Sequence, residues 1–99
     1  MERGGMSAEE RQTLKLAQII EIGNIAACRD ALMGLRASGA TQLVLDVEDL
    51  VAVDTAALQL LASFVMSVHA CGGRVEWENL SMPLCQAACV LGLEEALAL

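Results

Sequence analysis

The spacing of apolar residues changes several times along the chain, and each change predicts a different element. Apolar residues in 13–16 and 19–22 indicate extended chain, and a Gly-Asn pair at 23–24 indicates a turn. From Ile25 the apolar residues fall at helical spacing, with charged residues on the other side. The pattern therefore predicts a helix that begins at Ile25 and is closed by Gly39.

The middle of the chain contains the most apolar run. Residues 42–47 are apolar except for a Gln and one Asp, which is typical of a central strand covered on both faces. A second helix is predicted from Thr55 to about Ala70, where Gly72 and Gly73 stop it. The expected core stripe of this helix is Leu58, Leu61, Ala62, Val65 and Val68.

The last third alternates and then becomes helical again. Val75 and Trp77 alternate with charged residues, which indicates a half-buried strand near a sheet edge, where Trp77 packs against a helix. Ser81 is the expected cap of a third helix that has Pro83 in its first turn and ends at Gly92. The residues of this helix expected to face inward are Leu84, Ala87, Ala88 and Leu91.

Strands that alternate with helices predict an α/β fold. We expect a sheet of about four strands, mixed in direction, with helices packed mainly on one face. Residues 1–12 are polar and contain glycine, so we predict a flexible tail there and a single domain over 13–99.

The charge balance narrows the possible partners. The net charge is −7 with six Lys and Arg, which excludes the basic patch that nucleic acid requires and disfavours anionic lipid surfaces. The longest apolar stretch, 56–68, is interrupted by polar residues and is too short to cross a bilayer, so no membrane insertion is expected. The first twelve residues lack the apolar core of a secretion signal, and we therefore expect a cytoplasmic protein.

The cysteines could suggest a zinc site, but their surroundings favour core packing. Cys85 and Cys89 are four apart on a predicted helix, and His69 and Cys71 are further possible ligands. The chain has no C-x-x-C pair, and small apolar residues surround each thiol. We expect reduced thiols and no bound metal.

An acidic cluster precedes the second helix and raises the alternative of an enzyme. Asp46, Glu48, Asp49 and Asp54 could hold Mg²⁺ for phosphoryl transfer, but such a site needs further partners, commonly a lysine, and Lys15 is the only one. No phosphate-binding loop, nucleophile elbow or dinucleotide fingerprint is present. The cluster is better interpreted as a solvated loop, and we expect neither catalysis nor a cofactor.

The start of the second helix is the main candidate site. Asp54 is expected to cap the helix and Thr55 to occupy its first position, which is ordinary helix-start chemistry. A functional interpretation rests on a polar residue recurring every four positions along an otherwise apolar helix, with Met66 beside it. The candidate partner-binding residues are Asp54, Thr55, Ala56, Gln59, Ser63, Met66 and Ser67, with Thr55 also a candidate phosphorylation site, because a helix N-terminus tolerates phosphate.

Two segments carry a family resemblance. The stretch LVLDVEDLVAVDTAALQLL, followed by GGRVEWENLS and an apolar helix that ends in LGL, resembles the STAS domain over roughly 13–97. That family comprises bacterial anti-sigma-factor antagonists, a cytoplasmic subunit of lipid-asymmetry ABC transporters, and cytoplasmic tails of sulfate transporters. In the antagonists, a Ser or Thr directly after the Asp is phosphorylated by an anti-sigma kinase, and Thr55 stands at that position.

The sequence departs from the family pattern just after Thr55. The family usually has a small residue and then glycine there, whereas this chain has Ala56 and Ala57. Alanine favours helix, so the helix start is firmer than in the family. The turn is also less permissive without glycine, which disfavours the close approach of a partner.

The resemblance implies a binding module, with two alternative partners. One is an anti-sigma factor with a kinase-like fold, docked at Asp54 and Thr55 and released by phosphorylation of Thr55. The other is the ATPase subunit of a lipid-transport ABC complex, with Thr55 in constitutive contact. An adaptor beside chemotaxis-type signalling proteins is a third possibility within the same class.

Overall fold

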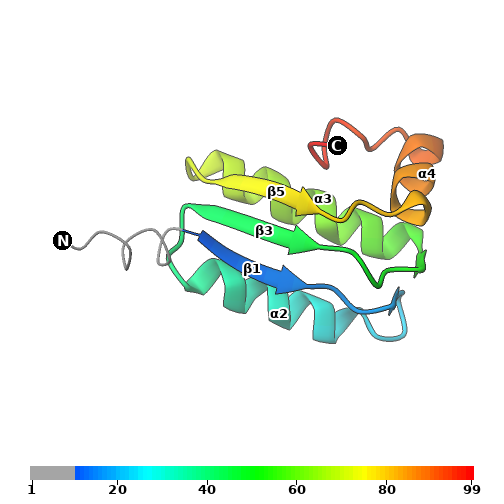
Figure 1. Ribbon diagram of the computed structural model, residues 1–99, viewed down its shortest axis with the longest axis horizontal. Coiled ribbons are helices and arrows are strands. Elements are labelled where there is room, and N and C mark those ends of the chain that lie inside the picture. The colour runs from blue at the N-terminus through cyan, green and yellow to red at the C-terminus, as the bar shows by residue number, and fades with distance from the viewer. Residues whose placement is uncertain (1–10) are drawn as a thin grey trace.

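The computed structural model describes residues 11–99, which form an α/β fold (Figure 1). Three parallel strands lie in the order β1 (Arg11–Lys15), β3 (Gln42–Asp46) and β5 (Arg74–Glu78). Two short parallel strands, β2 (Ile19–Ile20) and β4 (Ala52–Val53), form a second ladder. The helices are α2 (Ile25–Ala37), α3 (Thr55–Ala70) and α4 (Met82–Leu91).

Two helices cover one face of the three-stranded sheet. Helix α2 packs against β1, α3 packs against β5, and the two helices also contact each other. Helix α4 lies at the end toward which the strands point, where it contacts β4 and α3 (Figure 1). The predicted α/β class and the packing of helices mainly on one face are confirmed.

The burial pattern explains why the central strand is so apolar. Leu43 and Leu45 belong to the core under the helices, and successive side chains of a strand point to opposite faces. Val44 therefore points to the other face, between Thr13 of β1 and Glu76 of β5, and it is also fully buried. The predicted central position of this strand is confirmed, as is the buried stripe of α3.

The sheet differs in detail from the single mixed sheet of about four strands that we predicted. All strand pairs within residues 11–99 are parallel, and they divide into ladders of three and two strands. The division follows from the chain path after β1, because the carbonyl of Gln18 accepts from the N–H groups of both Val51 and Ala52. These bonds join β2 to β4 instead of extending the main sheet.

The folded domain also begins slightly earlier in the chain than the predicted residue 13. Strand β1 begins at Arg11, so two residues of the predicted tail 1–12 belong to the sheet. The remainder of that predicted tail, residues 1–10, lies outside the described residues.

The C-terminal segment supplies a core residue that the helix pattern did not assign. Leu91, expected to face inward, is 41% exposed, because α4 ends there and Gly92 turns the chain with φ 69°. The returning segment places Leu97 in the core with no exposed surface. The indole nitrogen of Trp77 donates to the Leu97 carbonyl at 2.8 Å, so Trp77 packs the sheet edge with help from this segment.

Candidate functional site

The Asp54–Thr55 corner forms where β4 leads directly into α3. Asp54 has extended backbone angles (φ −98°, ψ 178°), and one carboxylate oxygen accepts from the Ala57 N–H at 2.9 Å. The predicted N-cap is therefore confirmed. The other carboxylate oxygen accepts from the Ile22 N–H at 2.8 Å, so the same side chain also holds the turn between β2 and α2.

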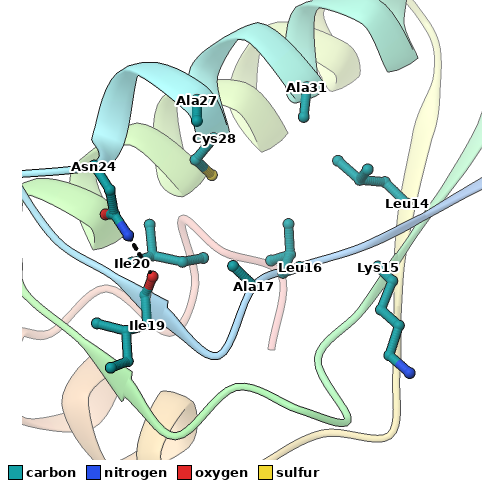
Figure 2. A pocket seen from close by; sticks show the side chains of 10 residues that line it. All are labelled: Leu14, Lys15, Leu16, Ala17, Ile19, Ile20, Asn24, Ala27, Cys28 and Ala31. Carbon is teal, nitrogen blue, oxygen red and sulfur yellow. Dashed lines mark hydrogen bonds between the residues drawn. The ribbon is translucent and has the colours of Figure 1, made fainter.

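The side chain of Asn24, which lies in the same turn, also stabilises it. The Asn24 side-chain oxygen accepts from the Glu21 N–H, and its nitrogen donates to the Ile19 carbonyl, both at 2.8 Å. Figure 2 shows Asn24 reaching back to Ile19 at the start of α2. The hydrogen bonds of Asp54 and Asn24 thus hold the β4–α3 junction and the β2–α2 turn together as one unit.

The bonds to Asp54 also set its charge. The N–H of Ala57, and after it the N–H of Ile22, hold the pKa of the Asp54 carboxyl below its usual value. Both donors favour the ionised form, because a carboxylate accepts stronger hydrogen bonds than a protonated carboxyl. A negative charge is thus held at the first turn of α3, directly beside Thr55.

Thr55 is exposed and lines an open groove between the start of α3 and α4. The groove has a volume of about 470 Å³. Within residues 11–99 the Thr55 hydroxyl has no hydrogen-bond partner. The apolar residues that line the groove are Val53, Leu58, Pro83, Ala87, Val90 and Leu91. The corner therefore presents a free hydroxyl next to an apolar surface.

Exposed apolar side chains lie in this groove and on the neighbouring segments. Val90 is 83% exposed and Ile22 is 70% exposed, and Val51, Leu80 and Met82 are also exposed. The segments that carry them lie together at the end toward which the strands point (Figure 1). Exposed apolar side chains gathered at one end of a molecule are typical of an interaction site. The sequence analysis did not predict this exposed apolar surface. Met82 and Val90 lie off the core stripe of α4, and that position could have indicated it.

The polar strip predicted along α3 does not form one surface. Four residues exceed one helical turn by about 40°, so the strip rotates by roughly 120° from Thr55 to Ser67. Thr55 faces the groove beside α4, whereas Ser63 and Ser67 line a different groove beside α2. Gln59 and Met66 are exposed, and Ala56 is partly buried. The structure brings Asp54, Thr55 and Ala56 together and separates Ser63, Met66 and Ser67 from them.

The acidic cluster is dispersed among structural contacts. Asp46 accepts from the Asn79 side chain at 3.1 Å and the Glu48 N–H at 2.9 Å, and these two bonds lower its pKa. Lys15 pairs with Glu48 at 3.5 Å and with Asp49 at 3.3 Å.

Among residues 11–99, no three His, Cys, Asp or Glu side chains lie together in a way that could hold a metal ion. No helix in the same part of the chain combines the length and apolar character needed to cross a membrane.

A smaller hollow lies behind the corner, between α2 and the β1–β2 segment (Figure 2). Its volume is about 180 Å³, and its walls include Leu14, Leu16, Ala31 and Cys28. Burial raises the pKa of the Cys28 thiol, so the sulfur stays protonated and unreactive at neutral pH. Cys28 therefore contributes packing, as the sequence indicated.

Comparison with known proteins gives similarity at the level of fold. No family model matches the chain, and no curated protein matches it. A solved structure of a sulfate transporter family protein from Wolinella succinogenes matches with a TM-score of 0.72 and 20% identity, covering 89% of this chain and 71% of that one.

Two crystal structures of Mglu are also similar. One has a TM-score of 0.63 and 33% identity over 74% of this chain, and the second, in its native form, has 0.59 and 28% over 70%. The chain spans only 18% and 21% of those two Mglu chains. These comparisons agree with a STAS-like fold. In Mglu, the similar region is only one part of a larger protein.

Proposed function

We propose that the chain is a non-enzymatic STAS-type module that binds a protein partner through the Asp54–Thr55 corner. The observation that carries this proposal is the free Thr55 hydroxyl beside an open apolar groove that includes the exposed side chains of Val90 and Leu91. A protein surface with its own apolar side chains fits such a site, because burying apolar area drives association.

The leading form of the proposal is an anti-sigma-factor antagonist with Thr55 as its switch. The partner is an anti-sigma factor with a kinase-like fold, and its capture frees a sigma factor. Phosphorylation would add about two negative charges at Thr55. Those charges would stand next to the ionised Asp54 and inside an apolar contact. Desolvating them without a cationic partner is unfavourable, so the phosphate would release the complex.

The similarity to a sulfate transporter family protein supports a second candidate. Here the chain is a permanent subunit of a membrane transport assembly, such as the cytoplasmic STAS subunit bound to the ATPase of a lipid-transport ABC complex. The same corner would then make constitutive contacts, and Thr55 would stay unmodified.

A comparison of Thr55→Ala, Thr55→Glu and Thr41→Glu tests the corner. Thr41 is an exposed threonine just before β3, at the opposite end of the sheet, so Thr41→Glu makes the same chemical change away from the site. Proteins retained from native lysate by the immobilised full chain are identified by mass spectrometry, and binding of the identified partner is then measured by calorimetry.

We expect Thr55→Glu to weaken binding by about 30-fold, or ~2 kcal/mol, through an unpaired charge in the interface. Thr41→Glu should bind like the wild type. For an antagonist, Thr55→Ala keeps binding, and incubation of the wild type with partner and ATP gives a phosphate on Thr55. For a transport subunit, both Thr55 variants loosen the complex and no phosphate is found. Equal binding by all variants would mean that the corner is only a helix cap.

A further inference from the structure

A second groove lies between α2 and α3, away from the Asp54–Thr55 corner. It is open, with a volume of about 450 Å³, and its apolar floor is formed by Leu32, Leu60 and Phe64. Leu60 and Phe64 lie on the side of α3 roughly opposite Leu58, which lines the corner groove. The two grooves are therefore separate surfaces of the same helix.

Two arginines of α2 line this second groove. Arg36 donates to the Ser67 hydroxyl and, at 3.0 Å, to the Cys71 sulfur, which holds its guanidinium across the junction of the two helices. Arg29 is exposed. In the part of the chain that the structure describes, neither arginine has an ion pair with a carboxylate.

Arg29 and Arg36 lack a carboxylate partner among residues 11–99, although the chain has a net charge of −7. On the sheet, Arg11 pairs with Glu76 and Glu78, and Lys15 pairs with Glu48 and Asp49, whereas Arg74 of β5 has no ion pair among residues 11–99. The groove thus combines an apolar floor with two guanidinium groups that have no carboxylate partner, on a molecule whose net charge is negative. Such a surface complements anionic groups of a partner at this one place.

The rim of the groove is adaptable as well. Met33, on α2 between the two arginines, is 63% exposed. An exposed methionine suits a binding surface that adjusts to apolar side chains of a partner, because its side chain is flexible and polarisable.

From these features we propose that the α2–α3 groove is a second docking surface, and that its occupant is an acidic amphipathic helix of a partner protein. A groove between two packed helices accepts a third helix that lays its apolar face on the floor. The exposed Arg29 guanidinium can bind a carboxylate through two parallel hydrogen bonds. Arg36, which already donates to Ser67 and Cys71, adds its positive charge and its remaining N–H groups. This surface is independent of the Thr55 corner and goes beyond the function proposed above.

The spacing of the arginines favours a helix over a single-headed anion. Arg29 and Arg36 are seven positions apart on α2, which is about 10 Å along the helix axis at 1.5 Å per residue. Carboxylates seven positions apart on a partner helix have the same separation, whereas a fatty acid offers one carboxylate and leaves one arginine without a partner.

The test uses the ¹⁵N-labelled full chain and a synthetic helical peptide of about 18 residues, or five turns. The peptide has leucines at i, i+4 and i+7 on one face and glutamates seven positions apart beside them. A matched peptide has lysine in place of each glutamate. The protein variants are Arg29→Glu in the groove and Arg74→Glu as the control, because Arg74 is an exposed arginine on β5 without an ion pair among residues 11–99.

We expect the glutamate peptide to shift the amide signals of Arg29, Met33, Ser63 and Ser67, and the lysine peptide to shift none of them. Arg29→Glu should weaken peptide binding by about tenfold or more, as expected for a charge reversal opposite a carboxylate. Arg74→Glu, with the same net charge, and Thr55→Glu should bind like the wild type.

Three results would overturn the proposal. One is equal weakening by Arg29→Glu and Arg74→Glu, which would indicate a response to net charge alone. Another is a set of shifts centred on the Thr55 corner. The third is saturable binding of decanoate at the groove with no binding of the glutamate peptide, which would assign the surface to a small anionic amphiphile.

Discussion

Asp54 shows how much one carboxylate can organise at this corner. Its two oxygens accept N–H groups from Ala57, three residues later, and from Ile22, 32 residues earlier in the chain. The first bond caps α3, and the second fixes the turn that begins α2. A single short side chain therefore ties together the starts of the two helices that cover the sheet.

This role predicts an acid-sensitive contribution to stability. Because the folded-state pKa of Asp54 is lowered, the stabilisation is complete above its unfolded pKa and is lost as the pH falls through the folded value. In Asp54→Asn the amide oxygen can still cap, but the charge is gone. The free energy of unfolding in urea should therefore be lower in the variant at pH 7, and the difference should shrink below about pH 3.

Comparison with the wild type at each pH is needed because Asp46 also has a lowered pKa and loses stabilisation in the same acidic range. That loss is common to both proteins and cancels in the difference. A difference that stays constant from pH 7 down to about pH 2 would contradict a charge-dependent role for Asp54.

At the scale of elements, the turn from α3 into β5 has the least room. A Cβ atom built on Gly73 would lie 2.8 Å from the Val68 Cγ1 and 3.2 Å from the Thr41 carbonyl oxygen. Val68 is buried in α3, and its branched side chain has few alternative rotamers there. The close approach of α3, β5 and the segment before β3 therefore requires glycine at position 73.

We predict that Gly73→Ala lowers the free energy of unfolding by about 1–3 kcal/mol, the range for overpacking a filled site. Urea denaturation measures the change. Gly34→Ala is the matched control, because Gly34 lies inside α2 with open space around it.

The control should change stability in the opposite direction, by up to about 1 kcal/mol, since alanine favours a helix interior. If both variants are stabilised, the turn after α3 has room that the structure does not show.

For the molecule as a whole, the C-terminal segment closes the core. Leu97 is fully buried, and its carbonyl accepts from the indole of Trp77, which is the only tryptophan of the chain. The far end of the sequence thus covers the edge strand β5.

We predict that Leu97→Ala lowers the free energy of unfolding by about 2–5 kcal/mol, because it removes a buried side chain and leaves a cavity. Tryptophan fluorescence should move to longer wavelength as the segment loosens over Trp77. Leu99→Ala serves as the control, since Leu99 is exposed and should change stability by no more than about 0.5 kcal/mol. Similar values for the two variants would mean that the segment does not seal the core.

The sequence by itself determined the elements whose signals are local. The bounds of α3 at Thr55 and Ala70, the caps at Asp54 and Ser81, and the central position of β3 follow from capping chemistry and apolar periodicity. These signals act between residues within about one helical turn or along one strand, so the linear pattern contains them.

The tertiary structure decided how these elements meet. The pairing of β2 with β4, the bond from Ile22 to Asp54 and the burial of Leu97 join residues far apart in the chain. Thr55 and Ser67 point in different directions around the axis of α3, so they lie in different grooves, each completed by another helix. A surface of this kind depends on which elements pack side by side, and that arrangement is fixed by the whole core, not by any local stretch of sequence.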